Sequence, residues 1–122
     1  MTLDPTIIDK AALERLEEWG GTKLSSEIVK LFLENGPARM DQIREAIEGD
    51  DLDVPERGAH SLKSSAANVG AQHVQRLSGE VELAASESDL QGVRDLIPNL
   101  EEAFSDASRE LEGLVKEEGN EA

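Results

Sequence analysis

Apolar residues recur at steps of three and four along almost the whole chain of 122 residues. This spacing is typical of amphipathic α-helices, in which positions three and four apart share a face. No segment alternates apolar and polar residues with enrichment in β-branched and aromatic types, so we expect no strands. The pattern predicts an all-α protein.

The N-terminal half of the chain is expected to hold one short and one long helix. The short helix should begin near Asp9 and end at Trp19, because Gly20-Gly21 stops it and Thr22 can cap the next helix. The long helix should span about 25 residues. Because proline removes a backbone donor and clashes with the preceding turn, we expect this helix to kink or divide at Gly36-Pro37. Its stripe of inward-facing positions comprises Leu24, Ile28, Leu31, Phe32, Asn35, Arg39, Ile43, Ala46 and Ile47.

Three further amphipathic helices are expected in the C-terminal half. The third helix should run from about Asp53 to Asn68, the fourth should start at Ala71, and Ser88 or Asp89 should cap the last. The inward-facing residues of the fourth helix are Val74, Leu77, Val81 and Ala84, and those of the last are Leu90, Val93, Leu96, Ile97, Leu100, Phe104, Ala107, Leu111 and Leu114.

Short connections between long amphipathic helices favour an antiparallel arrangement. We therefore expect an antiparallel up-and-down four-helix bundle, with the additional short N-terminal helix covering one end. The length suits a single core, so residues 1–122 should form one domain, with an ordered core over about 6–116 and a frayed tail at 117–122. Trp19, Phe32 and Phe104 are expected in the core, because large aromatic side chains are mostly buried.

The charge of the chain narrows the classes of partner. Lys and Arg total 12 against 27 Asp and Glu, which gives a net charge of −15. Neither DNA nor RNA is expected to bind, because nucleic acid affinity comes largely from basic side chains. An anionic membrane surface would repel the chain, and no apolar run approaches the roughly 18 residues of a transmembrane helix. The N-terminus does not resemble a secretory signal, so we expect a cytoplasmic protein.

The stretch AHSLKSSAANVGA, residues 59–71, holds one of only two histidines. At about 100° per residue, His60 lies about a quarter turn from the apolar arc of its helix, with Lys63 on the same side. The imidazole should therefore sit at the edge of the core with its tip in water. His73 is expected to be an ordinary surface residue, and no third ligand at helical spacing favours a metal site. The buried arc comprises Leu52, Ala59, Leu62, Ala66 and Val69.

An exposed imidazole can act as a nucleophile toward phosphorus, because with an ordinary pKa of about 6.5 it is mostly neutral at pH 7. A phosphoryl group on its outer nitrogen brings about two negative charges, and Lys63 could place its ammonium beside them. The chain has no glycine-rich phosphate loop and no second domain to hold ATP. We therefore do not expect the chain to phosphorylate itself, and any phosphoryl group on His60 should come from another protein.

The stretch 59–71, followed by LSGEVELAA at 77–85, resembles the signature of histidine-containing phosphotransfer (HPt) domains, A-H-x-L-K-G-x-x-x-x-[LIVM]-G-A. The long second helix containing LFLENGPARMDQIREAI also fits that family, so the resemblance covers about residues 6–116. It implies that His60 accepts a phosphoryl group from an aspartyl phosphate on a receiver domain and passes it to another receiver. It also implies that Lys63 stabilises the phosphoryl charge and that Gly70 ends the site helix. Ser64 stands where the family usually has glycine, which leaves room for a docking receiver.

The resemblance implies response-regulator receiver domains and a hybrid histidine kinase as partners. Mg²⁺ is expected in the receiver, and no cofactor or metal in this chain. A bundle that closes on itself needs no second copy, so we expect a monomer. The docking surface is expected to combine residues around the histidine with apolar residues near the N-terminus: Glu56, Arg57, Ser64, Ala67, Gly70, Ile7, Ile8 and Leu13.

Two alternatives remain open at this point. The chain could be a helical interaction module that carries no phosphate, or the phosphotransfer domain of a larger hybrid histidine kinase. Met1 at the start and the short acidic tail favour a separate protein. The donor, the acceptor, the signal and the direction of phosphate flow are not encoded in any recognisable pattern.

Overall fold

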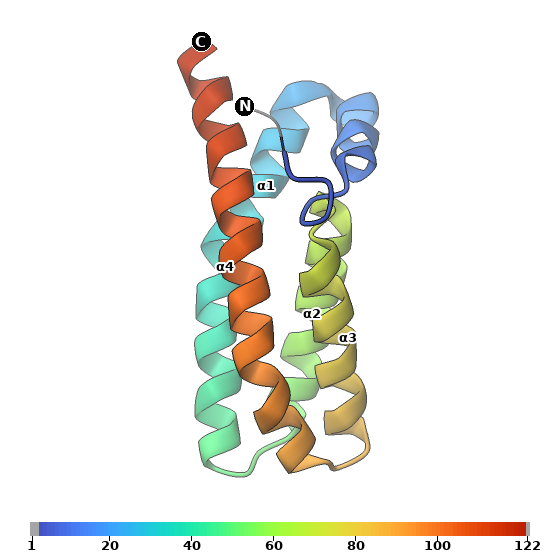
Figure 1. The fold of residues 1–122 in the computed structure, drawn as a ribbon, viewed down its shortest axis with the longest axis vertical. Helices are drawn as coiled ribbons and strands as arrows, with labels where there is room; N and C mark the ends of the chain where they lie inside the picture. Colours follow the sequence, from blue (N-terminus) through green and yellow to red (C-terminus); the bar gives the residue numbers. More distant parts are fainter. Residues whose placement is uncertain (1–2, 122) are drawn as a thin grey trace.

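The computed structural model describes residues 3–121, with side chains described as far as Val115. Its four helices are α1 (Lys10–Glu48), α2 (Asp53–Val69), α3 (Gln72–Ser86) and α4 (Leu90–Glu121). They run alternately down and up, and each packs against two neighbours, α1 and α3 each lying between α2 and α4 (Figure 1). The prediction of an all-α antiparallel four-helix bundle is confirmed.

The first part of α1 differs from the predicted separate short helix. Helix α1 is assigned as one element from Lys10, where Asp9 accepts the N–H of Ala11 as the cap. Within it, the backbone at Gly21 leaves the helical region, with φ 75° and ψ −172°. Only glycine adopts such a conformation readily. The segment before Gly21 therefore turns away from the long axis of the bundle and lies across one end of it (Figure 1).

The expected division of α1 at Gly36-Pro37 is wrong, because Pro37 lies inside the helix and Gly21 is its only non-helical position. Gly36 faces the core, where a Cβ atom would overlap the ring of Phe104. That ring packs against Phe32 with centroids 5.1 Å apart. Burial of these two rings offsets the hydrogen bond that Pro37 cannot make.

The inward-facing stripe of α1 is shifted from the predicted one. Leu31 is 50% exposed, because the buried positions follow a slightly different set of three- and four-residue steps. Trp19 is 88% exposed, so its expected place in the core is also wrong, whereas Phe32 and Phe104 are buried as predicted. The buried residues of α1 after Gly21 are Ser25, Val29, Phe32, Gly36, Met40, Ile43 and Ile47.

The N-terminal segment is fastened to the turn between α2 and α3. The N–H of Asp9 donates to the carbonyl of Gly70 at 2.7 Å, and the N–H of Gln72 donates to the carbonyl of Ile7 at 3.3 Å. Gly70 ends α2, as the sequence predicted, in the left-handed region with φ 76°. A Cβ atom there would overlap the backbone of Asp9, so glycine is needed both for the turn and for this close approach.

Candidate functional site

His60 lies in the middle of α2, one position after the fully buried Ala59. Its side chain is 65% exposed. The buried residues of α2 are Pro55, Ala59, Leu62, Ala66 and Val69, and they form a single face toward the bundle interior. The prediction that the imidazole stands at the edge of the core with its tip in water is confirmed.

A carboxylate from the neighbouring helix joins His60 and Lys63. Glu82 of α3 places Oε2 at 2.5 Å from Nδ1 of His60 and Oε1 at 2.8 Å from Nζ of Lys63. The side chain of Glu82 is only 21% exposed, and that of Lys63 is 36% exposed. The histidine and lysine that the sequence placed one helical turn apart are thus held by the two oxygens of one side chain.

The ionisation of Glu82 follows from these contacts. The hydrogen bond from Lys63 is the main reason why the pKa of this carboxyl lies below its ordinary value of 4.5. Its contact with His60 acts in the same direction, and partial burial acts against it. Glu82 is therefore a carboxylate at neutral pH.

The charge of Glu82 determines which nitrogen of His60 carries the proton. An ionised carboxylate can only accept hydrogen bonds, so Nδ1 of His60 must be the donor. In the neutral ring, Nε2 then keeps its lone pair. Because the side chain is largely exposed, that lone pair is open to an incoming group.

The surroundings of His60 are small or polar. Ser64 donates its hydroxyl to the carbonyl of His60 at 3.3 Å, which keeps its side chain against its own helix. An open cavity of about 430 Å³ is lined by Glu56, Arg57, His60, Ser61 and Glu82. Glu56 and Arg57 therefore line the same cavity as the imidazole, and Ser64 lies one helical turn along α2.

Three residues of the predicted docking surface lie inside the molecule. Ile8 and Leu13 are 0% and 4% exposed, and Gly70 is buried beneath the N-terminal segment. The side chains of Ile8 and Leu13 belong to the core and Gly70 is covered, so the prediction that these three residues contact a partner is wrong. Ile7 is half-buried.

An exposed apolar surface exists at the same end, but it is formed by other residues. Trp19 and Leu16 line a cavity of about 250 Å³, which Ala67 of α2 closes from the other side. Ala67 was predicted for the docking surface and Trp19 was not. Trp19 was expected in the core only because large aromatic side chains are mostly buried, but it lies at 88% exposure just before the break at Gly21.

Glu82 was absent from the predicted site, although chain geometry contains a signal for it. His60 lies eleven residues before Ala71, and Glu82 lies eleven residues after it. In two antiparallel helices joined by so short a turn, residues equally far from the turn lie side by side. The same count places Gly79 opposite Lys63, and a Cβ atom at Gly79 would lie 3.4 Å from Cδ of Lys63.

Two further features bear on the class of site. Within residues 3–121, none of the helices combines the length and apolar character needed to cross a membrane. Among the side chains that the structure describes, no three His, Cys, Asp or Glu residues converge in a way that suits a metal ion.

The fold and the site define an all-α bundle with an exposed imidazole oriented by a carboxylate, the class to which histidine phosphocarriers belong. The family model for the Hpt domain matches residues 27–117. The chain belongs to the Hpt domain family, which gives it a phosphotransfer role in two-component signalling.

Solved structures of this class have the same fold. Histidine-containing phosphotransfer protein B (HptB) from Pseudomonas aeruginosa PAO1 superposes with a TM-score of 0.88 at 21% identity, over 93% of this chain and 98% of that one. The phosphotransfer protein ZmHP2 from maize gives a TM-score of 0.84 at 22% identity, over 95% and 88%. A putative histidine-containing phosphotransfer protein from rice gives 0.79 at 21% identity, over 90% and 80%. A search with the sequence among curated proteins gave no match.

Proposed function

We propose that His60 carries a phosphoryl group between receiver domains, accepting it from an aspartyl phosphate on one and passing it to another. The observation that carries this proposal is the hydrogen bond between Nδ1 of His60 and Glu82, which leaves Nε2 free on an exposed ring. A carrier needs a nucleophile that is accessible and in the correct tautomer, and this contact supplies the second condition.

The transfer step follows from that tautomer. The lone pair of Nε2 attacks phosphorus, and a nitrogen–phosphorus bond forms as the bond from phosphorus to the aspartyl oxygen breaks. The leaving electron pair restores the receiver carboxylate. The ring keeps its proton on Nδ1 and becomes cationic, and the Glu82 carboxylate at 2.5 Å stabilises that charge. Transfer to the next receiver is the reverse of this step.

Lys63 stabilises the negative charge of the phosphoryl group. Its ammonium is held 2.8 Å from Glu82 in the unphosphorylated chain. A phosphoryl group on Nε2 offers it stronger acceptors one helical turn away, so we expect Lys63 to share its hydrogen bonds between Glu82 and the phosphoryl oxygens.

The partner completes the chemistry. The receiver supplies the aspartate and binds the Mg²⁺, and this chain contributes a nucleophile, a cation and a docking surface. We assign that surface to Glu56, Arg57 and Ser64 around the histidine and to Leu16, Trp19 and Ala67 at the capped end. The chain acts as a cytoplasmic monomer, and a hybrid histidine kinase is its expected source of phosphorylated receiver.

Phosphotransfer from isolated receiver domains tests this function. The chain is mixed with a panel of ³²P-phosphorylated receivers, and each mixture is resolved by gel electrophoresis. We expect acid-labile label to move from at least one receiver to the chain and to be absent from His60→Gln. His73→Gln is the matched control and should take up label normally, because His73 lies on α3 outside the site. Label on His60→Gln would refute the assignment.

A further inference from the structure

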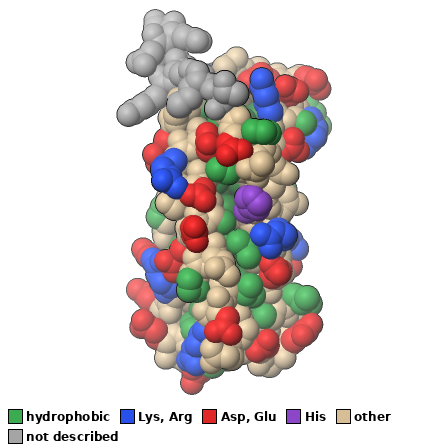
Figure 2. Space-filling view, in the orientation of Figure 1, with side chains coloured by type: hydrophobic (Ala, Val, Ile, Leu, Met, Phe, Trp, Pro, Cys, Tyr) green, Lys and Arg blue, Asp and Glu red, His purple; other side chains and the backbone are tan. Residues whose placement is uncertain are grey.

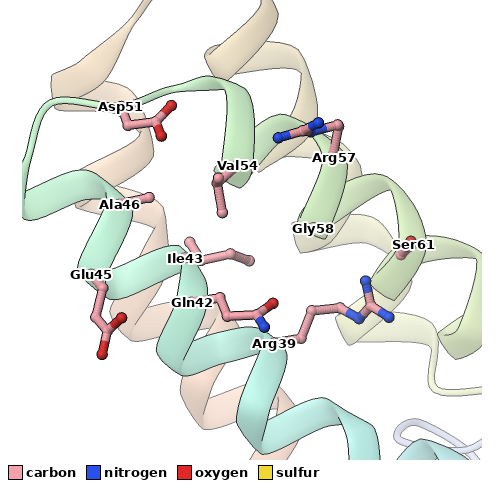
Figure 3. Close-up of a pocket in the computed structure, with 10 residues that line it drawn as sticks. All are labelled: Arg39, Gln42, Ile43, Glu45, Ala46, Asp51, Val54, Arg57, Gly58 and Ser61. Atoms are coloured by element: carbon pink, nitrogen blue, oxygen red, sulfur yellow. The ribbon is translucent and has the colours of Figure 1, made fainter.

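Two arginines from neighbouring helices face one open cavity beside the histidine. Arg39 of α1 and Arg57 of α2 line a cavity of about 630 Å³ between these helices. Figure 3 shows the two side chains on either side of Gly58, with the Arg39 guanidinium toward Ser61. The cavity is open at the surface, so a group from another molecule can enter it.

These two arginines differ from most of the others of the bundle. Of the other five arginines, Arg44, Arg76, Arg94 and Arg109 each form an ion pair with a carboxylate, and only Arg15, near the N-terminal end of α1, has none among the described residues. Neither Arg39 nor Arg57 forms one within the part of the chain that the structure describes. In a chain with 27 acidic residues and only 12 Lys and Arg, two unpaired guanidiniums at one cavity are unexpected.

Gly58 creates the space that the two side chains share. A Cβ atom at this position would lie 3.2 Å from Cγ1 of Ile43, closer than a well-packed contact, and 3.9 Å from Cγ of Arg39. The glycine therefore lets α1 approach α2 and lets the Arg39 side chain extend past the site helix. Any larger residue would narrow the cavity between the guanidiniums.

The carboxylates that line the same cavity do not neutralise the pair. Figure 3 shows the Glu45 side chain directed away from the guanidiniums. The Oδ1 atom of Asp51 accepts the N–H of Asp53 at 2.8 Å, at the start of α2. The cavity therefore keeps a positive side next to the histidine.

The cavity is continuous with the proposed docking surface. Arg57 and Ser61 line it, and they also line the cavity that contains His60 and Glu82. A protein that covers the imidazole must therefore pass over the two arginines or come close to them. Guanidinium groups match the planar geometry of carboxylates, which they bind through paired hydrogen bonds.

We propose that the cleft formed by Arg39 and Arg57 binds acidic side chains of the receiver domain that docks over His60, and that it selects among receivers. This inference rests on the proposed function. A protein carboxylate is favoured over a small free anion because the cleft opens onto the docking surface. The two guanidiniums of the cleft also attract an acidic partner locally, where the net charge of −15 would otherwise repel it.

The test uses the receiver that labels the unchanged chain in the panel described above. Arg39→Gln should lower the second-order rate constant of transfer by about tenfold, and Arg39→Lys should recover part of the loss. Arg109→Gln is the matched control, since it removes the same charge from α4, which does not pack against α2. Its rate should stay within about twofold of the unchanged chain.

Two measurements separate docking from other effects. Direct phosphorylation of His60 by phosphoramidate needs no protein partner, so Arg39→Gln should leave its rate unchanged. Added NaCl should accelerate receiver transfer more in Arg39→Gln than in the unchanged chain. In the variant, salt screens mainly the repulsion between two acidic proteins, whereas in the unchanged chain it also screens the attraction to Arg39. A merely structural role for Arg39 would not change this salt dependence.

Each contrary outcome has its own meaning. If no receiver labels the unchanged chain, the proposed function fails and this inference fails with it. If transfer occurs but Arg39→Gln matches Arg109→Gln, the cleft has no part in docking and the inference alone is overturned. If sodium phosphate at constant ionic strength inhibits the unchanged chain but not Arg39→Gln, the cleft is a site for small anions, and the proposal of a protein carboxylate is overturned.

Discussion

At the scale of single residues, the site depends on one carboxylate with two contacts. Glu82 orients the ring of His60 through one oxygen and holds Lys63 through the other. The two contacts have different consequences. The contact with His60 determines the tautomer of the nucleophile, and the contact with Lys63 holds its ammonium near the imidazole. Substitution of each partner should therefore change different measurements.

Removal of the cation should slow transfer without abolishing it. In Lys63→Ala the nucleophile remains, but the phosphoryl oxygens lose a charged donor. We expect the rate of transfer from a receiver to fall by about one to two orders of magnitude. Rapid-quench measurement of label on the chain tests this. Lys63→Arg keeps the charge and should lose less, and an Ala variant with an unchanged rate would contradict the role.

Removal of the orienting carboxylate should change the tautomer of His60. In Glu82→Ala, Nδ1 loses its acceptor, so we expect ¹⁵N resonances of the ring to shift toward the form protonated on Nε2. The rate with phosphoramidate should fall by roughly tenfold, which corresponds to about 1.4 kcal/mol.

The neutral isostere provides the comparison for this prediction. Glu82→Gln keeps a hydrogen-bond acceptor but no charge, so it should retain the tautomer and lose part of the rate. Equal rates for Glu82, Gln and Ala at this position would show that the contact does not orient the nucleophile.

These residues also mark how far the sequence could predict the site. The apolar arc of α2 predicted the exposure of His60 and the position of Lys63 on the same side, because both follow from the helical repeat alone. The places of Glu82 and Arg39 beside the site depend on how one helix packs against another. The exposure of Trp19 depends on where the backbone of α1 bends. Periodicity within one helix contains neither kind of information. The apolar character of Ile8 and Leu13 did not by itself distinguish a docking residue from a core residue.

At the scale of elements, two glycines allow the helices to pack as they do. Gly36 lets the ring of Phe104 lie against α1, and Gly70 lets the N-terminal segment lie against the end of α2. The helical pattern predicted the four helices of the bundle and their order, but it also predicted a separate short N-terminal helix, which the structure has as the first part of α1. It did not predict that Gly36-Pro37 would continue a helix, because that outcome depends on an aromatic ring from α4.

Filling the space at Gly36 should destabilise the bundle. Alanine has the higher helix propensity by up to about 1 kcal/mol, but its Cβ atom would overlap Phe104. We expect the overpacking to dominate, so that Gly36→Ala lowers the free energy of unfolding by about 1–2 kcal/mol in urea titrations.

A smaller partner at position 104 separates the two effects. In a Phe104→Leu background the overlap is relieved, so Gly36→Ala should then be neutral or stabilising. A loss of the same size in both backgrounds would mean that the ring contact is not the cause.

At the scale of the whole molecule, the dominant property is negative charge. Acidic side chains are spread over the face shown in Figure 2, with fewer basic ones between them. A net charge of −15 on 122 residues opposes compaction through mutual repulsion. The hydrophobic core, which continues along all four helices, offsets that repulsion.

Salt should therefore stabilise the fold. We expect the Tm to rise by about 3–6 °C between roughly 0.02 and 0.5 M NaCl at pH 7, as screening removes about 1 kcal/mol of repulsion. Circular dichroism at 222 nm is a suitable readout. Near the sequence pI of about 4.4 the same salt increase should have little effect. A Tm that falls with salt at pH 7 would mean that surface ion pairs outweigh repulsion.

The chain reverses direction between α2 and α3 within two residues, Gly70 and Ala71. The number of residues between His60 and this turn therefore determines which side of α2 faces Glu82. An extra residue inserted after His60 and before that reversal would rotate the following part of α2 by about 100°. Glu82 would then confront a different side of the helix from the imidazole. Lengthening the loops at the opposite end of the bundle leaves this spacing unchanged, whereas an insertion between the nucleophile and its carboxylate separates them.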